Sequence, residues 1–175
     1  MSNEHSDSLI GKNDRPWYSS AGKLIDRGDE MDQATFSRRV DEAKSSHPAW
    51  FDLPGDRRAS ETDLGWVEDA VGVRLPDDLR WFLATFGGGD FAFQCVFSAD
   101  PTSHWYLLEQ QPDRDPVDFV AFADDGTGNL FGFRVVGGEA LEVVHILDHE
   151  SNEIRPLSGE GFLAFLARTA FSTEA

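Results

Sequence analysis

Cysteine, basic residues and long apolar runs are all scarce in this sequence of 175 residues. The single cysteine, Cys95, excludes an internal disulfide framework and agrees with a reducing compartment. Cys95 lies within an apolar stretch, so we expect a buried, small hydrophobic side chain. No apolar run approaches the length of a membrane span. The first ten residues lack the basic start and apolar stretch of a secretory signal, so we expect a cytoplasmic protein without membrane partners.

Lysine and arginine together number 15, against 32 aspartates and glutamates, which gives a net charge of −17. Such a field repels nucleic acid and anionic membrane surfaces, and it attracts basic partners. A negative surface is usually a device for solubility. At −17 the charge exceeds what solubility requires in so short a chain. It suits a protein that captures a basic partner quickly, because complementary fields raise association rates.

The motifs of several enzyme classes are also missing. The sequence contains no phosphate-binding GxxxxGK[ST] pattern, no HExxH, no CxxC pair and no GxSxG. A single cysteine also excludes a zinc site built from several thiolates. We therefore expect neither a bound cofactor nor a resident metal.

What the sequence does contain is ample material for a hydrophobic core. Hydrophobic residues make up 40% of the chain, and the 14 phenylalanines and 5 tryptophans dominate its aromatic content. The length suits one domain with an extension. Residues 1–32 are polar, with Trp17 and Tyr18 as their only aromatic pair, and we expect a mobile or loosely docked arm. We place an N-terminal extension at residues 1–58, consisting of this arm and one docked helix, and the main domain at 59–175.

Two helices are predicted between residues 32 and 72. Residues 32–46 carry a thin apolar stripe, and Asp32 can cap their first turn. The second helix begins at Ser60, because a serine followed three residues later by the acid Asp63 is typical of a capping box. Gly72 closes that helix.

The stretch that organises the chain is VRLPDDLRWFLATFGGGDF, residues 73–91. Its apolar positions recur with the spacing of one helical face, which predicts a short helix; they are Leu79, Phe82, Leu83 and Phe86. Pro76 suits the first helical position because its missing N–H would have no intrahelical partner. The glycines at 87–89 end the helix and lead into an apolar strand at 91–97.

Beyond residue 89 the apolar period changes from 3.6 towards 2, which indicates strands. The strand candidates are residues 91–97, 105–108, 119–123, 130–135 and 141–147. Turn residues at 124–129, 136–139 and 148–152 separate the later strands and predict hairpins. A closing helix is expected over 159–171, with Ser158 as its cap. The pattern predicts an α+β fold, in which an N-terminal helix pair and a closing helix accompany a central antiparallel sheet of about five to six strands.

One segment invites an enzymatic interpretation. His145, Asp148, His149 and Glu150 place two imidazoles and two carboxylates within six residues, which could hold a divalent metal or transfer protons. In an extended segment, however, the two histidines lie about 13 Å apart at ~3.3 Å per residue, too far to share one ion. We favour a strand that runs into a turn built from local hydrogen bonds.

Asp124 and Asp125 suggest a second metal site, since paired carboxylates bind calcium or magnesium. A calcium-binding loop of the EF-hand type needs further acids at alternate positions and a closing glutamate, and these are missing here. We therefore favour a hairpin turn. A hydrolase or metal enzyme that uses Asp124, Asp125, His145 and His149 remains a third functional hypothesis.

At this point the pattern resembles the SUKH superfamily, which is named partly after a regulator of fungal cell-wall synthesis. The opening signature is carried by Glu68, Val71, Gly72, Leu75, Pro76, Leu79, Phe82, Leu83, Gly87 and Gly88. Residues 122–131, 143–150 and 162–166 resemble the later acidic hairpin, strand and closing helix of the family. The resemblance covers roughly residues 59–170. Phe86 departs from it, because the family often has asparagine there.

The resemblance implies an α+β fold without enzymatic activity, and no catalytic residues are carried over. Bacterial members are mostly immunity proteins that bind and neutralise a toxin domain, often a nuclease or deaminase. A few act instead as intracellular scaffolds or regulators, which is the alternative function here.

An immunity protein would recognise its toxin through loops and aromatic anchors. The candidate contacts are Trp105, Tyr106, Asp124, Asp125, Asp148 and Glu150. Each aromatic among them has an alternative place in the core. The expected partner is a basic toxin protein, not a nucleic acid, and the expected state is a monomer or weak homodimer.

Overall fold

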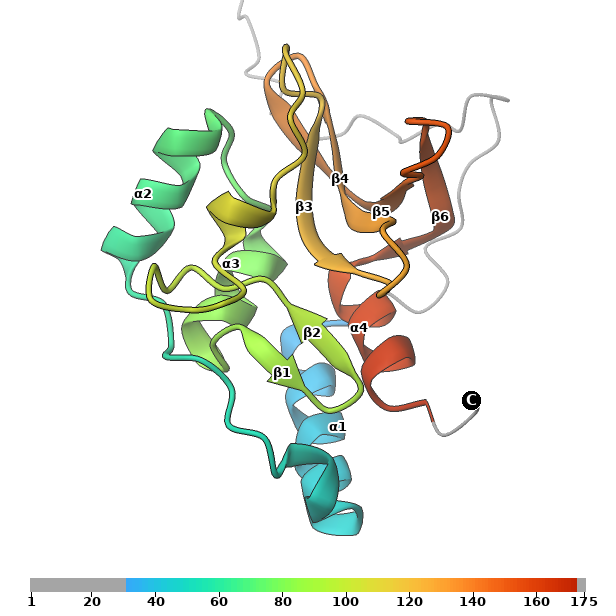
Figure 1. Cartoon of the computed structure of the whole chain (residues 1–175). Helices are drawn as coiled ribbons and strands as arrows, with labels where there is room; N and C mark the ends of the chain where they lie inside the picture. The colour runs from blue at the N-terminus through green and yellow to red at the C-terminus, as the bar shows by residue number, and fades with distance from the viewer. Residues whose placement is uncertain (1–30, 173–175) are drawn as a thin grey trace, which may run out of the picture.

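The computed structural model describes residues 31–172 of the chain (Figure 1). The predicted arm, with Trp17 and Tyr18, lies outside this range apart from its last two residues. In chain order the elements are α1 (Gln33–Ser46), the 3-10 helix η1 (Pro48–Phe51), α2 (Glu61–Val71), α3 (Asp77–Thr85), β1 (Gly89–Phe91), β2 (Gln94–Val96), the 3-10 helix η2 (Leu107–Gln110), β3 (Phe119–Asp124), β4 (Leu130–Val136), β5 (Glu139–Leu147), β6 (Ile154–Gly161) and α4 (Phe162–Ala170).

The predicted α+β fold is confirmed, with a difference in how the strands are arranged. An antiparallel sheet has the order β3-β4-β5-β6, and β1 and β2 form a separate two-stranded sheet. One hydrogen bond, from Phe97 N to Phe122 O at 2.7 Å, joins the segment after β2 to β3. The six strands of the described residues are therefore divided between two sheets, where the sequence predicted one.

The predicted starts of α1 and α2 are confirmed. The Asp32 carboxylate accepts a hydrogen bond from Thr35 N at 2.7 Å. Ser60 and Asp63 form a reciprocal capping box, in which each side chain accepts from the other residue's backbone amide. Gly72 ends α2 in the left-handed conformation, with φ of 77°. These signals lie within a few residues of the helix ends that they stabilise, which is why the sequence reveals them.

The helix predicted from Pro76 starts one residue later, because Pro76 has an extended ψ of 144° and occupies the N-cap position of α3. The glycines that follow α3 do more than end it. A Cβ on Gly88 would lie 2.5 Å from the Cα of Ser98, and one on Gly87 would lie 2.2 Å from the carbonyl oxygen of Asp56. These glycines therefore permit three chain segments to pass in close contact.

Two predicted strands are wrong. Residues 91–97 are not one strand: a two-residue turn, Ala92 and Phe93, separates β1 from β2. Residues 105–108 are not a strand either, because Leu107 begins η2 and only a single bridge joins Tyr106 to Ser98. Both segments are apolar runs that lack turn-forming residues, so their composition does not predict that the chain turns there.

The predicted closing helix begins too early in the sequence, at residue 159. Residues 154–161 form β6, and α4 begins directly after it at Phe162. Ser158 does not cap the helix: its hydroxyl donates to Glu160 at 2.9 Å, and the N-cap position is Gly161. Strand β6 is mostly exposed and contains Pro156, as is common at the edge of a sheet, so it lacks an alternating apolar pattern.

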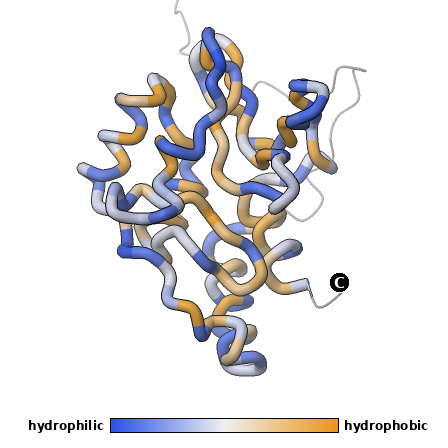
Figure 2. The backbone as a smooth tube through the Cα atoms, in the orientation of Figure 1, coloured by the Kyte–Doolittle hydropathy of each residue, from blue (hydrophilic) through white to orange (hydrophobic). Residues whose placement is uncertain are grey.

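Phenylalanine rings join the helices to the sheet. Phe162 of α4 lies 5.5 Å from Phe82 of α3 and 5.0 Å from Phe122 of β3, measured between ring centroids. Phe36 of α1 contacts Phe82 at 6.2 Å. All four rings are buried, and each contributes ~1.5–3 kcal/mol on burial. Helix α1 therefore packs into the same core as the main domain. Figure 2 shows hydrophobic segments running through the middle of the molecule.

Glu68, the first residue of the family-like signature, has a clear structural role. Its side chain accepts a hydrogen bond from Leu75 N at 2.8 Å and pairs with Arg80 at 2.6 Å. Both charged side chains are about one-sixth exposed, at 17% and 16%. Glu68 therefore ties the end of α2 to the connection before α3 and to α3 itself.

Cys95 is half-buried rather than buried, because β2 is a short strand of a two-stranded sheet. Burial, followed by the negative charge of Asp90 opposite, raises the pKa of the Cys95 thiol to about 12. The thiol is therefore protonated at neutral pH.

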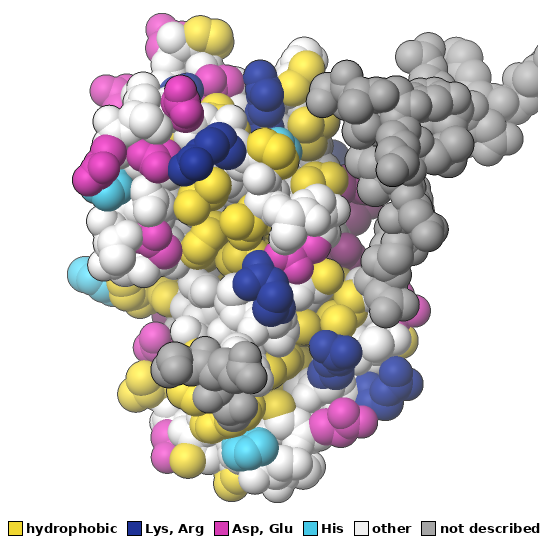
Figure 3. Space-filling view, turned by 90° about the vertical axis from the view of Figure 1, so that its right-hand side faces the viewer, with side chains coloured by type: hydrophobic (Ala, Val, Ile, Leu, Met, Phe, Trp, Pro, Cys, Tyr) yellow, Lys and Arg dark blue, Asp and Glu magenta, His cyan; other side chains and the backbone are white. Residues whose placement is uncertain are grey.

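Within residues 31–172, no helix is both long and apolar enough to cross a membrane. Figure 3 shows one face on which hydrophobic side chains run between acidic and basic ones.

Candidate functional site: two adjacent acidic turns

Two turns lie side by side at one end of the four-stranded sheet. The β3–β4 turn, residues 124–129, and the β5–β6 turn, residues 148–153, flank the same strand end. Leu130 pairs with Asp124 on one side and with Leu147 on the other. The antiparallel register therefore makes neighbours of the two turns that carry four of the proposed contact residues, which are Asp124, Asp125, Asp148 and Glu150.

The β3–β4 turn is built around the Asp125 carboxylate. It accepts hydrogen bonds from Thr127 N and Oγ1, both at 2.8 Å, and from Asn129 N and Nδ2, at 3.1 and 2.8 Å. Partial burial raises the pKa of Asp125, but these hydrogen bonds outweigh it and leave the pKa below its usual value. Asp124 makes a smaller turn of the same kind, accepting from Gly126 N at 2.9 Å.

The β5–β6 turn is built in the same way around Asp148. Its carboxylate accepts from Ser151 N at 2.9 Å, from Glu150 N at 3.1 Å and from Arg155 at 2.8 Å. The backbone hydrogen bond from Ser151 is the main cause of a lowered pKa for Asp148. Both turns thus hold an ionised aspartate in a fixed position.

His149 connects the two turns. Its backbone N–H donates to Asn129 Oδ1 at 3.0 Å, and its Nδ1 lies 2.9 Å from the same oxygen. Gly128 permits this contact, because a Cβ there would lie 3.1 Å from the His149 ring and the glycine has a φ of 111°. The turns therefore form one unit, which we call the paired turns.

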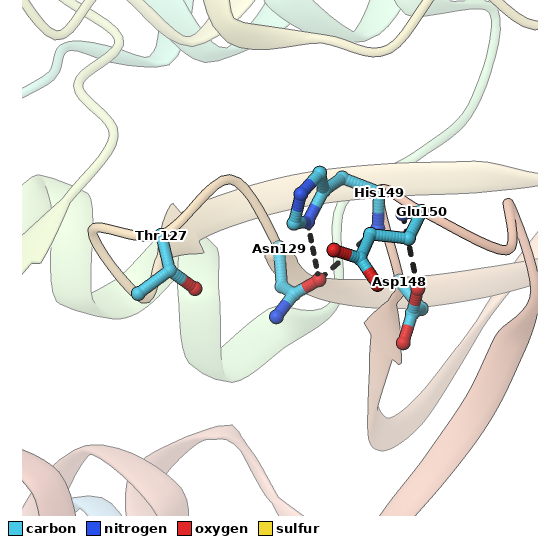
Figure 4. Close-up of a pocket in the computed structure, with 5 residues that line it drawn as sticks. All are labelled: Thr127, Asn129, Asp148, His149 and Glu150. Carbon is cyan, nitrogen blue, oxygen red and sulfur yellow. Dashed lines mark hydrogen bonds between the residues drawn. The ribbon is translucent and has the colours of Figure 1, made fainter.

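An open hollow of about 420 Å³ lies between the paired turns, lined by Thr127, Asn129, Asp148, His149 and Glu150 (Figure 4). Its polar walls suit contact with charged or hydrogen-bonding groups of a partner. Glu150 is exposed, and its carboxylate makes no ion pair within the part of the chain that the structure describes. This carboxylate is free to pair with a basic side chain from outside.

Trp105 and Tyr106 lie in a different place. The loop that carries them follows β2 and leads into η2, which packs beside α2 (Figure 1). Trp105 is half-buried against Phe97, with ring centroids 6.4 Å apart. Burial, with the negative charges of Glu109 and Asp63, raises the pKa of Tyr106. No hydrogen bond or ring contact among residues 31–172 joins either aromatic to the paired turns.

The histidines of the metal hypothesis have separate environments. His145 is buried in β5, where its Nδ1 lies 2.9 Å from Val143 O, and burial lowers its pKa. His149 is exposed and held by Asn129. The described residues contain no group of three or more His, Cys, Asp and Glu side chains arranged to hold a metal ion.

The sequence interpretation missed three exposed apolar side chains. Trp66, Leu53 and Phe93 are 67%, 64% and 59% exposed. Trp66 could have been found from the helical period, because it lies off the face that holds Leu64 and Val67. Phe93 could not have been found in this way, because the sequence predicts one continuous strand over residues 91–97.

Comparison with known proteins supports the resemblance. A family model described as SUKH_6, SMI1-KNR4 cell-wall, matches residues 61–166. The match runs from the first residue of α2 into α4, and so includes α3, both sheets and the paired turns. Searches of curated proteins and of solved structures found no significant match. Because the family model spans more than half of the chain, this protein belongs to the SMI1-KNR4 family of the SUKH superfamily.

Proposed function

We propose that this protein is an immunity protein that binds a bacterial toxin domain and neutralises it. Family membership supports this role, because the bacterial SUKH proteins that the sequence resembles are mostly immunity proteins. We infer a stoichiometric binding function in the cytoplasm, without catalysis.

The observation that carries the proposal is the geometry of the paired turns. Asp125 and Asp148 are held by hydrogen bonds within their turns, and the Glu150 carboxylate beside Asp148 makes no ion pair within residues 31–172. A surface that is already rigid loses little conformational entropy when it binds. Preorganised negative charge of this kind supports recognition of a basic protein.

The overall charge supports the same class of partner. A toxin that cuts or modifies nucleic acid needs a basic surface for the phosphate backbone. An acidic protein can occupy that surface, and a net charge of −17 would speed the encounter. We propose that Asp124, Asp125, Asp148 and Glu150 contact the toxin, while Trp105 and Tyr106 contribute from the separate loop near α2.

The test is co-expression with any toxin domain that a neighbouring gene encodes, followed by binding measurements on the purified pair. The test variant combines Asp124→Asn with Glu150→Gln. The control combines Asp41→Asn with Glu42→Gln, which removes the same charge from the exposed face of α1. We expect the test variant alone to lose protection, and its association rate to fall and become less sensitive to salt.

Three outcomes would contradict the proposal or part of it. If the wild-type protein neither binds the toxin domain nor protects cells, the immunity function is wrong. If both variants weaken binding equally, only net charge matters and the paired turns are not the contact surface. If a pull-down from native cells recovers a housekeeping complex instead of a toxin, the protein acts as a scaffold or regulator.

A further inference from the structure

A second surface, remote in sequence from the paired turns, carries exposed apolar side chains. Trp50 of η1 and Phe93 of the β1–β2 turn have ring centroids 5.0 Å apart, and His47 stacks on Trp50 at 4.0 Å. Leu53 follows η1 and is 64% exposed, while Phe93 is 59% exposed. We call Trp50, Leu53 and Phe93 the apolar patch. Trp50 itself is half-buried. Exposed apolar groups that gather on one surface typically mark an interaction site.

A hollow of about 230 Å³ adjoins the apolar patch. Leu53 lines it, together with four more apolar residues, Phe51, Pro54, Phe86 and Phe91. In Figure 1 the tip of the β1–β2 hairpin points towards the end of the molecule where α1 and η1 lie. The hollow offers a place where an apolar side chain of a partner could be buried.

The backbone holds Phe93 in its exposed position. Ala92 has a φ of 51°, a conformation that costs a residue with a Cβ ~1–2 kcal/mol. The Phe93 amide donates to Ala170 O at 3.2 Å, which fastens the turn to the end of α4. The turn is therefore strained, and it presents an aromatic ring to solvent. Conformational strain of this kind is commonly retained at binding sites.

The charges around the patch indicate which partner fits it. Asp52 and Asp90 flank the apolar residues, and both are exposed without an ion pair in the region the structure describes. Asp90 also lines the hollow, as does Lys44, whose Nζ lies 5.4 Å from the centroid of the Phe51 ring. A second copy of this chain would bring another charge of −17 to the surface, so a basic protein is the better partner.

We propose that the apolar patch docks a basic protein, with an apolar side chain of that protein in the hollow and basic side chains on Asp52 and Asp90. This inference rests on the proposed function, since it assigns the patch to the same toxin as the paired turns. The toxin then contacts two surfaces: one supplies the apolar anchor, and the other supplies preorganised charge. Interfaces commonly combine a few apolar anchors with a charged rim.

The test places the photo-crosslinking residue p-benzoylphenylalanine at position 93 of the full-length protein in its own cells. A second protein carries the same residue at position 136, where Val136 of the β4–β5 hairpin is similarly exposed, at 54%, and serves as the matched control. After irradiation, crosslinked partners are identified by mass spectrometry. We expect one basic protein from position 93 and not from position 136.

Purified variants then measure the anchor directly. We expect Phe93→Ala and Leu53→Ala each to weaken binding of the crosslinked protein by at least ~10-fold, and Val136→Ala to change it less than about twofold. Crosslinking only to a second copy, crosslinking to no basic protein, or equal losses for all three variants would overturn the proposal.

The outcomes also separate this inference from the proposed function. If position 93 crosslinks a basic protein that is not a toxin, and the alanine variants weaken its binding, the docking surface stands and the immunity function is wrong. If the toxin domain binds and is neutralised while Phe93→Ala has no effect, the immunity function stands and the apolar patch is wrong.

Discussion

The side-chain oxygen of Asn129 accepts a hydrogen bond from the backbone amide of His149 at 3.0 Å. The same side chain donates from Nδ2 to Asp125 at 2.8 Å. One amide therefore connects the two hairpin turns and supports the carboxylate at the centre of the first turn. This relationship makes the rigidity of the paired turns testable.

We predict that Asn129→Ala separates the two turns. The His149 amide loses its acceptor, and the free energy of unfolding falls by about 1 kcal/mol. Hydrogen exchange should show faster exchange of the His149 amide, and urea unfolding should show the loss of stability. Thr127→Ala is the control, because it removes a hydrogen bond within the first turn only. Unchanged exchange at His149 in Asn129→Ala would contradict this prediction.

We predict that Asp125 stabilises the fold near neutral pH and that this contribution is lost in acid. Its folded pKa is lowered, so its contribution is present above the unfolded pKa of about 3.9 and is lost as pH falls through the folded pKa. Unfolding curves from pH 2 to 7 should show that Asp125→Asn is less stable than wild type near neutral pH and that the difference shrinks in acid. Thr127→Val should act in the same direction but less, because it removes a single donor. A difference that stays constant with pH would contradict the assignment.

We predict that Glu68→Ala destabilises the protein by about 2–3 kcal/mol, because it leaves Leu75 N without its acceptor and Arg80 without its partly buried partner. Glu68→Gln should cost less, since its side-chain oxygen can still accept from Leu75 N. Glu61→Gln is the matched control, because Glu61 also pairs with Arg80 but its side chain is 82% exposed. Thermal or urea unfolding would rank the three variants, and an equal loss for Glu61→Gln and Glu68→Ala would refute this role.

We predict opposite effects for alanine at two glycines. Gly88→Ala places a Cβ 2.5 Å from the Ser98 backbone and should cost ~1–3 kcal/mol or more, as overpacking does. Gly65→Ala lies within α2 with nothing inside 4 Å of the new methyl group, and should stabilise by ~0.5–1 kcal/mol. Urea unfolding measures both changes. Equal stability of the two variants would mean that the segments around Gly88 do not pass as closely as described.

Much of the helical structure followed from local chemistry. The capping box of Ser60 and Asp63, and the left-handed Gly72, act within one turn of the helix end that they stabilise. Short range also explains the two hairpin turns, because Asp125 and Asp148 bond to backbone groups no more than four residues away. Such signals need no knowledge of the rest of the fold.

The errors lie where distant segments decide the local structure. The Ala92–Phe93 turn contains no turn-forming residue, and its amide is held by Ala170 of α4. Strand β6 lacks an apolar alternation, and it forms because it pairs with β5 at the edge of the sheet. Neither partner is visible from the local sequence.

The sequence by itself determined the α+β class, the helix boundaries near their caps, the acidic character and the residues of the paired turns. The tertiary structure alone decided that the turns carrying Asp124 and Glu150 are neighbours, since strand register sets which turns lie side by side. It also separated Trp105 from those turns and brought Trp50 to Phe93. The physical reason is the separation in sequence between the residues that interact. Caps and turns are stabilised by neighbours along the chain, whereas surfaces are assembled by packing between segments far apart in sequence.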